Sequence, residues 1–506
     1  MMEEKNLHIT PKVYFSDHFN VGRSIIEGYG AIDISLLADI PLFIDPFLIF
    51  ESDKEEYKKL HESIIDYLKF LKEVAPLAHD NTAMQKAWFC FGEVEQNWLG
   101  FSKNSNKGTG LGERFARSLS GGLGKILDSI DDKRLAKGVH LEKLCIIEEG
   151  VGRDKISDLT ANLIKGYLAE YTEKFAKLYI DNKLVKEVSV ERALFNYDTK
   201  RWMPKTYNLP YIPNYNSYVL LTPADMLTKD DTWISSASFY SELPNLPNAV
   251  ENEELRLAVN NYINSLMPND PVASDKKKVY LRTAKKFPEL VDVYIRRQEE
   301  IGEQAVCQSL SRVQYAKDIF TGNAKDAIDR LCLETNFYAD TPQLQSSFEE
   351  AIRRVHILKS FIEDNDGYKC FFDRKGNRIH NEDELQRLFK LIWIANKSQY
   401  DINPETNHGR GPVDFVVSFG SGDKTYVEFK LASNTKLKNN LSKQVEIYQN
   451  ADVASLDTKS LKVILFFNED EYKRANAILE DLGVKNSNGI VMIDGSCNNK
   501  PSGSKA

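Results

Sequence analysis

Apolar residues recur at intervals of three and four over residues 381–396, which predicts an amphipathic helix. The repeating positions are Leu385, Leu388, Phe389 and Ile392. A second helical pattern covers residues 441–451. The two predicted helices enclose a segment with a different periodicity.

Short runs rich in β-branched and aromatic residues predict strands in this part of the chain. These runs lie at 400–403, 413–419, 425–431 and 461–467. A Gly-Ser-Gly-Asp sequence at 420–423 separates the second run from the third and is typical of a hairpin turn. The pattern therefore predicts the order helix, three strands, helix, strand.

Upstream of residue 381 the chain first mixes helix and strand patterns and then becomes mostly helical. Helices are predicted at 54–74, 157–180, 251–267, 287–320 and 343–363, and strands at 186–194 and 218–221. The longest helical stretch, 287–320, is rich in Arg, Gln and Glu. It resembles an arm or a dimer-forming helix more than a core element.

A chain of 506 residues is expected to form about three domains of roughly 150 residues each. We expect a multidomain α/β protein with a mixed α+β regulatory or sensing region at 1–245. A helical linker or oligomerisation region would follow at 246–370 and a third domain at 371–495. The tail, 496–506, is expected to be disordered.

Cysteine, histidine and apolar patterns exclude several classes of protein. The six cysteines form no C-x-x-C pair and the eight histidines form no cluster, so we expect neither a disulfide framework nor structural zinc. No signal peptide is evident, and the most apolar stretch, 31–50, is interrupted by Asp and Pro residues that would prevent it from spanning a bilayer. We expect a reduced, cytoplasmic protein.

A net charge of -8 argues against a protein that coats nucleic acid non-specifically. It leaves room for a locally basic cleft, because salt limits the range of surface charges to about 8–10 Å. Engagement with a nucleic acid would then be selective or need activation.

Two carboxylates and one lysine are expected to converge at the predicted hairpin. Asp414 lies in the first strand of this hairpin, and Glu428 and Lys430 lie two residues apart in its second strand. Side chains alternate along a strand, so Glu428 and Lys430 point the same way while Phe429 points into the core. Carboxylates bind hard cations, which polarise phosphoryl groups and lower the pKa of attacking water. The lysine would orient that water or neutralise developing charge.

Pro412-x-Asp414 and Glu428-x-Lys430 resemble the signature of the PD-(D/E)xK, or restriction-endonuclease-like, nuclease superfamily. The resemblance covers about residues 382–493 and implies an αβββαβ core in the C-terminal domain. It also implies a Mg²⁺- or Mn²⁺-dependent deoxyribonuclease in which Asp414, Glu428 and Lys430 are catalytic. DNA is the expected substrate, with RNA left open.

Further residues match the exonuclease-like branch of this superfamily. Gln444 and Tyr448 form a Q-x-x-x-Y motif on one helical face, which the resemblance places beside the nucleic-acid strand. Tyr448 could instead simply pack. Arg410, Asn434 and Lys436 are candidate phosphate contacts, with an ordinary solvated face as the alternative.

Glu384 occupies the place where many members of the superfamily keep an additional metal ligand. It also completes a capping box with Asn381, in which the glutamate reaches back to the N-cap amide. Glu405 competes for the ligand role from the end of the preceding strand. The sequence leaves these alternatives open.

The sequence also suggests two biological settings. A large upstream region joined to such a nuclease resembles a bacterial antiviral defence or restriction effector, oligomeric and switched on by a phage-derived or protein activator. The alternative is a non-catalytic nucleic-acid-binding or assembly module with the same fold. The acidic segment at 148–158 and the glycine-rich segment at 107–112 are better explained as a helix start and a turn than as further sites.

Overall fold

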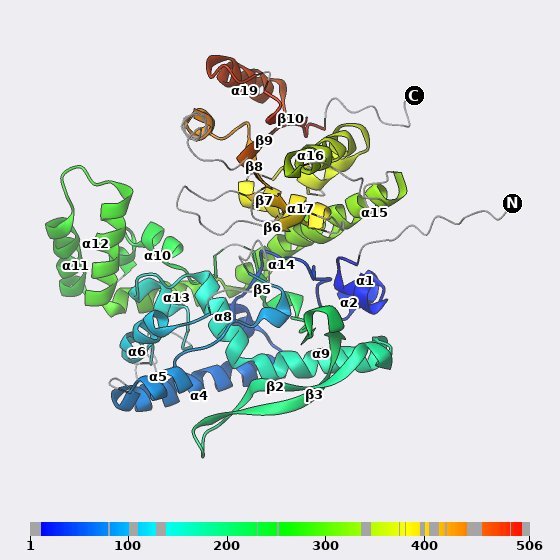
Figure 1. The fold of residues 1–506 in the computed structure, drawn as a ribbon. Helices are drawn as coiled ribbons and strands as arrows, with labels where there is room; N and C mark the ends of the chain where they lie inside the picture. The colour runs from blue at the N-terminus through cyan, green and yellow to red at the C-terminus, as the bar shows by residue number, and fades with distance from the viewer. Residues whose placement is uncertain are drawn as a thin grey trace.

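The computed structural model describes residues 12–78, 81–100, 110–127, 138–229, 231–249, 252–334, 346–373, 375–379, 381–394, 400–403, 414–419, 423–442, 458–485 and 487–497. Within these ranges the fold is mixed α/β, and its largest sheet has five strands and lies in the C-terminal part (Figure 1). No helix in these ranges is long and apolar enough to cross a membrane.

The N-terminal region combines helices with small sheets (Figure 1). Its helices are α1 (Phe15–Phe19), α2 (Arg23–Gly28), α3 (Pro46–Glu51), α4 (Glu55–Ala78), α5 (Thr82–Trp88), α6 (Glu113–Leu127), α7 (Lys143–Ile147), α8 (Arg153–Leu163), α9 (Lys165–Tyr179) and α10 (Ser236–Glu242). Its strands are β1 (Phe43–Ile44), β2 (Val185–Asn196), β3 (Arg201–Ile212), β4 (Ser217–Tyr218) and β5 (Leu227–Thr228). The prediction of α4 and β2 is confirmed, whereas the helix predicted at 157–180 is divided at Ile164 into α8 and α9.

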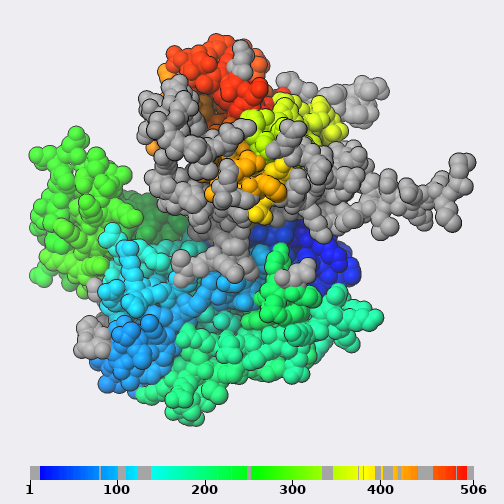
Figure 2. Space-filling model, viewed as in Figure 1, coloured from blue at the N-terminus to red at the C-terminus, as the bar shows by residue number. Residues whose placement is uncertain are grey.

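The middle of the chain is helical, as predicted, but it does not form an arm. Its elements are α11 (Glu253–Leu266), α12 (Ala273–Lys286), α13 (Pro288–Glu300), α14 (Gly302–Ala316), the π-helical segment η7 (Lys317–Asn323), α15 (Ala324–Glu334) and α16 (Ser347–Asp364). α11 and α12 form a lobe that projects from one side of the molecule (Figure 1 and Figure 2).

The stretch 287–320, predicted as an arm or dimer-forming helix, is broken into α13, α14 and the start of η7. Leu290, Val291 and Tyr294 are fully buried, and α14 packs against α3 and β5 of the N-terminal region. The expectation of an arm is wrong because the apolar residues of α13 form a helical stripe wide enough to bury.

The C-terminal sheet has the strand order β10-β9-β8-β7-β6. Its strands are β6 (Asp401–Asn403), β7 (Phe415–Phe419), β8 (Asp423–Leu431), β9 (Thr458–Phe466) and β10 (Ile490–Asp494), and its helices include α16, α17 (Glu382–Ile394) and α19 (Glu469–Asp481). β6, β7 and β8 are antiparallel neighbours, and β9 joins β8 in parallel. Residues 437–442 begin the helix predicted at 441–451, whose remainder lies outside the described residues.

The apolar stripe predicted for α17 is confirmed. Leu385, Leu388 and Phe389 are almost fully buried, and the Phe389 ring stacks on Phe429 of β8 with 4.5 Å between centroids. Phe429 therefore points into the core, which turns its neighbours Glu428 and Lys430 to the other face of β8.

A different side of α17 contacts the N-terminal region. Arg387, which is 2% exposed, donates hydrogen bonds to the backbone carbonyls of Gly100 (3.0 Å) and Asp39 (3.5 Å). Lys390 is also buried, and burial lowers its pKa to about 7 although the Asp39 carboxylate opposes the shift. The helix beside the C-terminal sheet is thus anchored in the N-terminal region.

The end of the described chain is ordered slightly beyond the predicted boundary. Ser496 is buried, and its backbone N–H donates to the carboxylate of Asp494 at 2.8 Å. The rest of the predicted tail, 498–506, lies outside the described residues.

Candidate functional site

Asp414 stands immediately before β7, at the edge that faces β8. Its carboxylate accepts a hydrogen bond from the backbone N–H of Phe429 (2.6 Å) and another from Nε2 of Gln386 on α17 (2.5 Å). Hydrogen bonds to a carboxylate are stronger than those between neutral groups. Two elements, β8 and α17, therefore fix the orientation of this carboxylate.

Lys430 lies on β8 between three carboxylates. Its Nζ is 4.0 Å from Asp414 Oδ2 and 3.5 Å from Glu382 Oε2. Burial acts to lower the pKa of Lys430, but the Asp414, Glu382 and Glu428 carboxylates together outweigh it and raise the pKa above its usual value. Lys430 is consequently an ammonium ion at neutral pH, held by charge on several sides.

Glu428 forms a buried ion pair with Lys462 of β9. The two residues are direct partners in the parallel β8–β9 ladder, and Nζ of Lys462 is 2.8 Å from Oε1 of Glu428. Glu428 is 2% exposed and Lys462 6% exposed. Burial lowers the pKa of Lys462 despite the opposing effect of the Glu428 carboxylate. Lys462 was not among the predicted site residues, although it is the single lysine in the apolar strand predicted at 461–467.

α17 contributes Glu382 to this cluster. Besides its contact with Lys430, Glu382 accepts a hydrogen bond at Oε1 from Nδ2 of Asn434 (2.7 Å). Asn434 was a predicted phosphate contact, and its side-chain oxygen also accepts from the backbone N–H of Lys436 (2.9 Å). The Lys436 residue is exposed. Asn434 thus belongs to the cluster through Glu382.

The structure places Glu384 apart from these residues. Its carboxylate forms an ion pair with Lys229 and lies 3.5 Å from the hydroxyl of Tyr315. Residues two apart on a helix point about 200° apart, so Glu382 and Glu384 face opposite sides of α17. The predicted N-cap Asn381 accepts a hydrogen bond at its side chain from the backbone N–H of Asp383 (3.0 Å).

Several predicted site residues cannot be placed. Arg410, Gln444, Tyr448 and the competing ligand Glu405 lie outside the described residues. Those that the structure brings together are Asp414, Glu428, Lys430 and Asn434, joined by the unpredicted Gln386, Glu382 and Lys462. This set is called the carboxylate–lysine cluster below.

The carboxylate oxygens of Asp414, just before β7, and of Glu428, on the neighbouring β8, are the kind of donor that a hard divalent cation prefers. In the part of the chain that the structure describes, however, no three His, Cys, Asp or Glu side chains are grouped closely enough to hold a metal. The Glu428 carboxylate is engaged by Lys462 and that of Asp414 by Gln386. A cation would have to draw Glu428 from its lysine partner.

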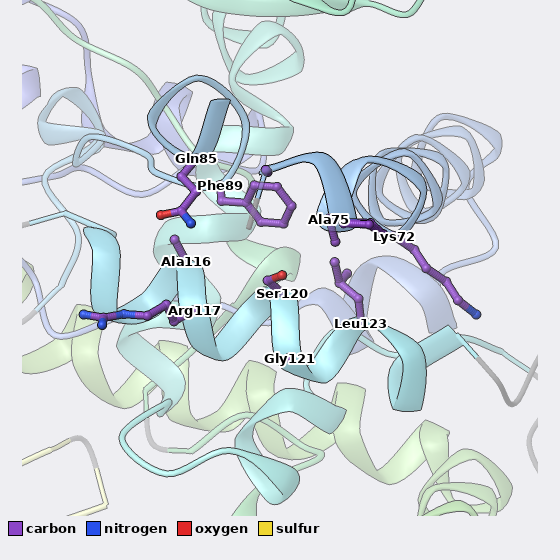
Figure 3. A pocket seen from close by; sticks show the side chains of 11 residues that line it. Lys72, Ala75, Gln85, Phe89, Ala116, Arg117, Ser120, Gly121 and Leu123 are labelled. Carbon is purple, nitrogen blue, oxygen red and sulfur yellow. The ribbon is translucent and has the colours of Figure 1, made fainter. Parts of the chain in front are cut away.

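The N-terminal region contains a mostly apolar cavity of ≈ 590 Å³ between α4, α5 and α6 (Figure 3). The Phe89 ring and Leu123 lie along it, and Lys72 and Arg117 lie at its two ends. Its described lining residues include no carboxylate or histidine.

The carboxylates in the acidic segment 148–158 are not arranged as a second cluster: Glu148, Asp154 and Asp158 are half-buried, and Glu149 is exposed. Burial, with smaller effects from Asp154 and Glu93, raises the pKa of Asp158 to about 8. Asp154, in the first turn of α8, has a pKa raised by burial. These groups add no metal site among the described residues.

Two family models match the chain. One, described as a domain of unknown function (DUF8370), matches residues 20–235. The other, also described as a domain of unknown function (DUF8371), matches residues 347–469, from the first residue of α16 to the first of α19. No curated protein and no solved structure matches the chain. The second match includes every residue of the carboxylate–lysine cluster.

Proposed function

We propose that this protein is a Mg²⁺- or Mn²⁺-dependent nuclease that hydrolyses DNA phosphodiester bonds at the carboxylate–lysine cluster. The observation that carries the proposal is the convergence of Asp414, Glu428 and Lys430 at the β7–β8 edge. The order α17, β6, β7, β8 and then parallel β9 supports a restriction-endonuclease-like core. A chance occurrence of the short sequence motif would not be expected to coincide with this order of helices and strands.

Each residue of the cluster has a separate role in the proposed reaction. A divalent ion held by the carboxylates of Asp414 and Glu428 would supply the polarisation of the phosphoryl group and an activated water. Lys430, kept protonated by its acidic neighbours, is positioned to orient that water or to neutralise charge on the phosphoryl oxygens. Gln386 and the backbone N–H of Phe429 hold Asp414 in one orientation. Glu382 holds Lys430 and Asn434 together.

A non-catalytic nucleic-acid-binding or assembly module remains the second candidate. The Glu428–Lys462 ion pair favours it, because this pair satisfies a buried carboxylate without any cation. Mn²⁺ titration separates the two candidates: ligand that binds the folded state raises the melting temperature by mass action. A nuclease site gives a shift that Asp414→Ala removes, whereas an assembly module gives the same shift in both proteins.

Contacts between the N-terminal region and α17 support the proposal that the enzyme is regulated. α17 carries two members of the cluster and is also anchored by Arg387 to Gly100 of the region matched by the first family model. We infer that the N-terminal region controls cleavage, as in a bacterial antiviral defence or restriction effector that responds to an activator. Assembly into a homo-oligomer is part of this proposal and is tested by sedimentation of the full chain with and without DNA.

A substrate panel tests the enzymatic function. Full-length protein is incubated with supercoiled DNA, linear duplex, single-stranded DNA and RNA in Mg²⁺, Mn²⁺ or EDTA. We expect metal-dependent cutting of at least one DNA form by the wild type and none by Asp414→Asn. Metal-independent cutting, or equal cutting by both proteins, would contradict the proposal.

A further inference from the structure

A second cleft lies on the other side of α17 from the carboxylate–lysine cluster. Its volume is ≈ 620 Å³, within the range of small-ligand sites. One wall is formed by the α14–η7 segment and the other by the turn at 373–378 that precedes α17. Four cationic side chains line it: Lys229, Arg312, Lys375 and Arg378.

Two of these cations are anchored at their positions by carboxylates. Lys229 pairs with Glu384, and Nη1 of Arg378 is 2.7 Å from Oε1 of Glu471 on α19. A guanidinium has five N–H donors, so an arginine held by one carboxylate can still donate to a phosphate. The anchoring reduces the side-chain entropy that a ligand would otherwise have to overcome.

The two carboxylates in the lining are largely engaged within the protein. Asp373 accepts from the backbone N–H groups of Lys375 (2.9 Å) and Asn377 (2.8 Å). Asp318 is 6% exposed and accepts from Nε2 of Gln314 at 2.8 Å. Both negative charges are therefore partly neutralised by donors, and the four cations dominate the accessible lining.

The cleft also contains an aromatic ring. Tyr315 is partly exposed, and Nζ of Lys229 lies 4.7 Å from its ring centroid. Cationic groups combined with an aromatic ring form the usual surface for a nucleotide strand, since phosphates bind the cations and a base stacks on the ring. The same combination is unsuited to a purely apolar ligand.

Contacts of α17 connect the cleft to the cluster. Glu382 reaches Lys430 and Asn434 on one side of the first helical turn, and Glu384 reaches Lys229 and Tyr315 on the other. A helix with its side chains is about 10–12 Å wide. A strand that leaves the cluster and crosses the start of α17 would enter the cleft within a few nucleotides.

We propose that this cleft binds a flanking nucleotide of the nucleic-acid strand that is cut at the carboxylate–lysine cluster. Arg312 and Lys375 contact its phosphates, and Tyr315 stacks on its base. The inference rests on the proposed nuclease function, but it concerns strand binding and is measured without cleavage.

The test uses full-length Asp414→Asn and fluorescence anisotropy of labelled oligothymidylates of increasing length. In this background Tyr315→Leu should weaken binding at least about fivefold, and Tyr315→Phe should retain affinity because the ring remains. Arg312→Ala with Lys375→Ala should weaken binding and reduce the salt dependence of affinity by about one to two phosphate contacts. Lys473→Ala, an exposed α19 lysine, is the matched control.

The inference would be overturned if the cleft variants kept the affinity and salt dependence of Asp414→Asn alone, with unchanged melting temperatures. Full displacement of the oligonucleotide by a single thymidine nucleotide would overturn it too, because the cleft would then be a free-nucleotide site. Failure of the nuclease proposal is distinguishable, since it would appear as absent cutting by the wild type while strand binding is measured independently.

Discussion

Glu428 on β8 and Lys462 on β9 form a buried ion pair 2.8 Å long at the centre of the candidate site. Each charge is removed from water, so each depends on the other. Any divalent cation that binds Glu428 competes with this lysine. The pair therefore connects the stability of the metal-free protein to its affinity for metal.

We expect Lys462→Met to lower the free energy of unfolding in EDTA by about 3–5 kcal/mol, because it leaves a buried carboxylate without its counter-charge. The same variant should gain a larger Mn²⁺-induced rise in melting temperature than the wild type, since the cation no longer displaces a lysine. Thermal unfolding with and without Mn²⁺ measures both effects. Equal Mn²⁺ shifts in the two proteins would show that no cation reaches Glu428.

Gln386 is expected to orient the Asp414 carboxylate for catalysis. Gln386→Leu removes the 2.5 Å hydrogen bond to Asp414 and should reduce the rate of cleavage about 10- to 100-fold, as loss of residues that orient metal ligands usually does. The apparent Mn²⁺ affinity should fall as well, whereas a purely structural role would lower only the melting temperature. Gln298→Leu, on α13, removes a comparable hydrogen bond to the Glu242 carboxylate outside both the cluster and the second cleft, and is the control.

Arg387 is expected to stabilise the protein and to hold α17 against the N-terminal region. Arg387→Met leaves the Gly100 carbonyl without this donor and should cost about 1–3 kcal/mol. Limited proteolysis should then release a C-terminal fragment faster than in the wild type. Unchanged proteolysis and stability would indicate that α17 does not join the two regions.

Because the pKa of Asp158 is raised in the folded protein, we expect the free energy of unfolding to depend on pH. Its pKa is about 8 in the folded protein against 3.8 ordinarily, so the folded state keeps a proton that the unfolded chain releases. Its contribution to stability is therefore complete at low pH and is lost as the pH rises from about 4 through about 8. Asp158→Asn should stabilise the protein by about 1 kcal/mol at pH 8 and less at pH 5. Denaturant unfolding at the two pH values measures the difference, and an equal effect at both would contradict the assignment.

Local periodicity was enough to predict much of the C-terminal sheet. The stripe of Leu385, Leu388 and Phe389 identified α17, and alternation along β8 assigned Phe429 to the core. Both inferences depend only on neighbours in the sequence. Such patterns repeat every two or 3.6 residues and need no knowledge of the remaining chain.

Residues that act across elements could not be found in this way. Lys462 meets Glu428 only through the register of two parallel strands, which local sequence does not specify. Glu382 and not Glu384 belongs to the cluster because of the orientation of α17 about its own axis. Arg387 and the N-terminal region partly set that orientation, which local sequence does not reveal. The burial of α13 similarly depends on a surface contributed by distant residues.

DNA cleavage by a Lys430 variant tests whether the carboxylate–lysine cluster is a nuclease site. Single-turnover hydrolysis of a DNA substrate in Mg²⁺ is compared among wild type, Lys430→Ala and the exposed-lysine control Lys473→Ala, with Mn²⁺ melting shifts recorded for each. We expect Lys430→Ala to lose cleavage while keeping a Mn²⁺ shift, and Lys473→Ala to resemble the wild type. Wild-type cleavage by Lys430→Ala would contradict a catalytic role for this cluster.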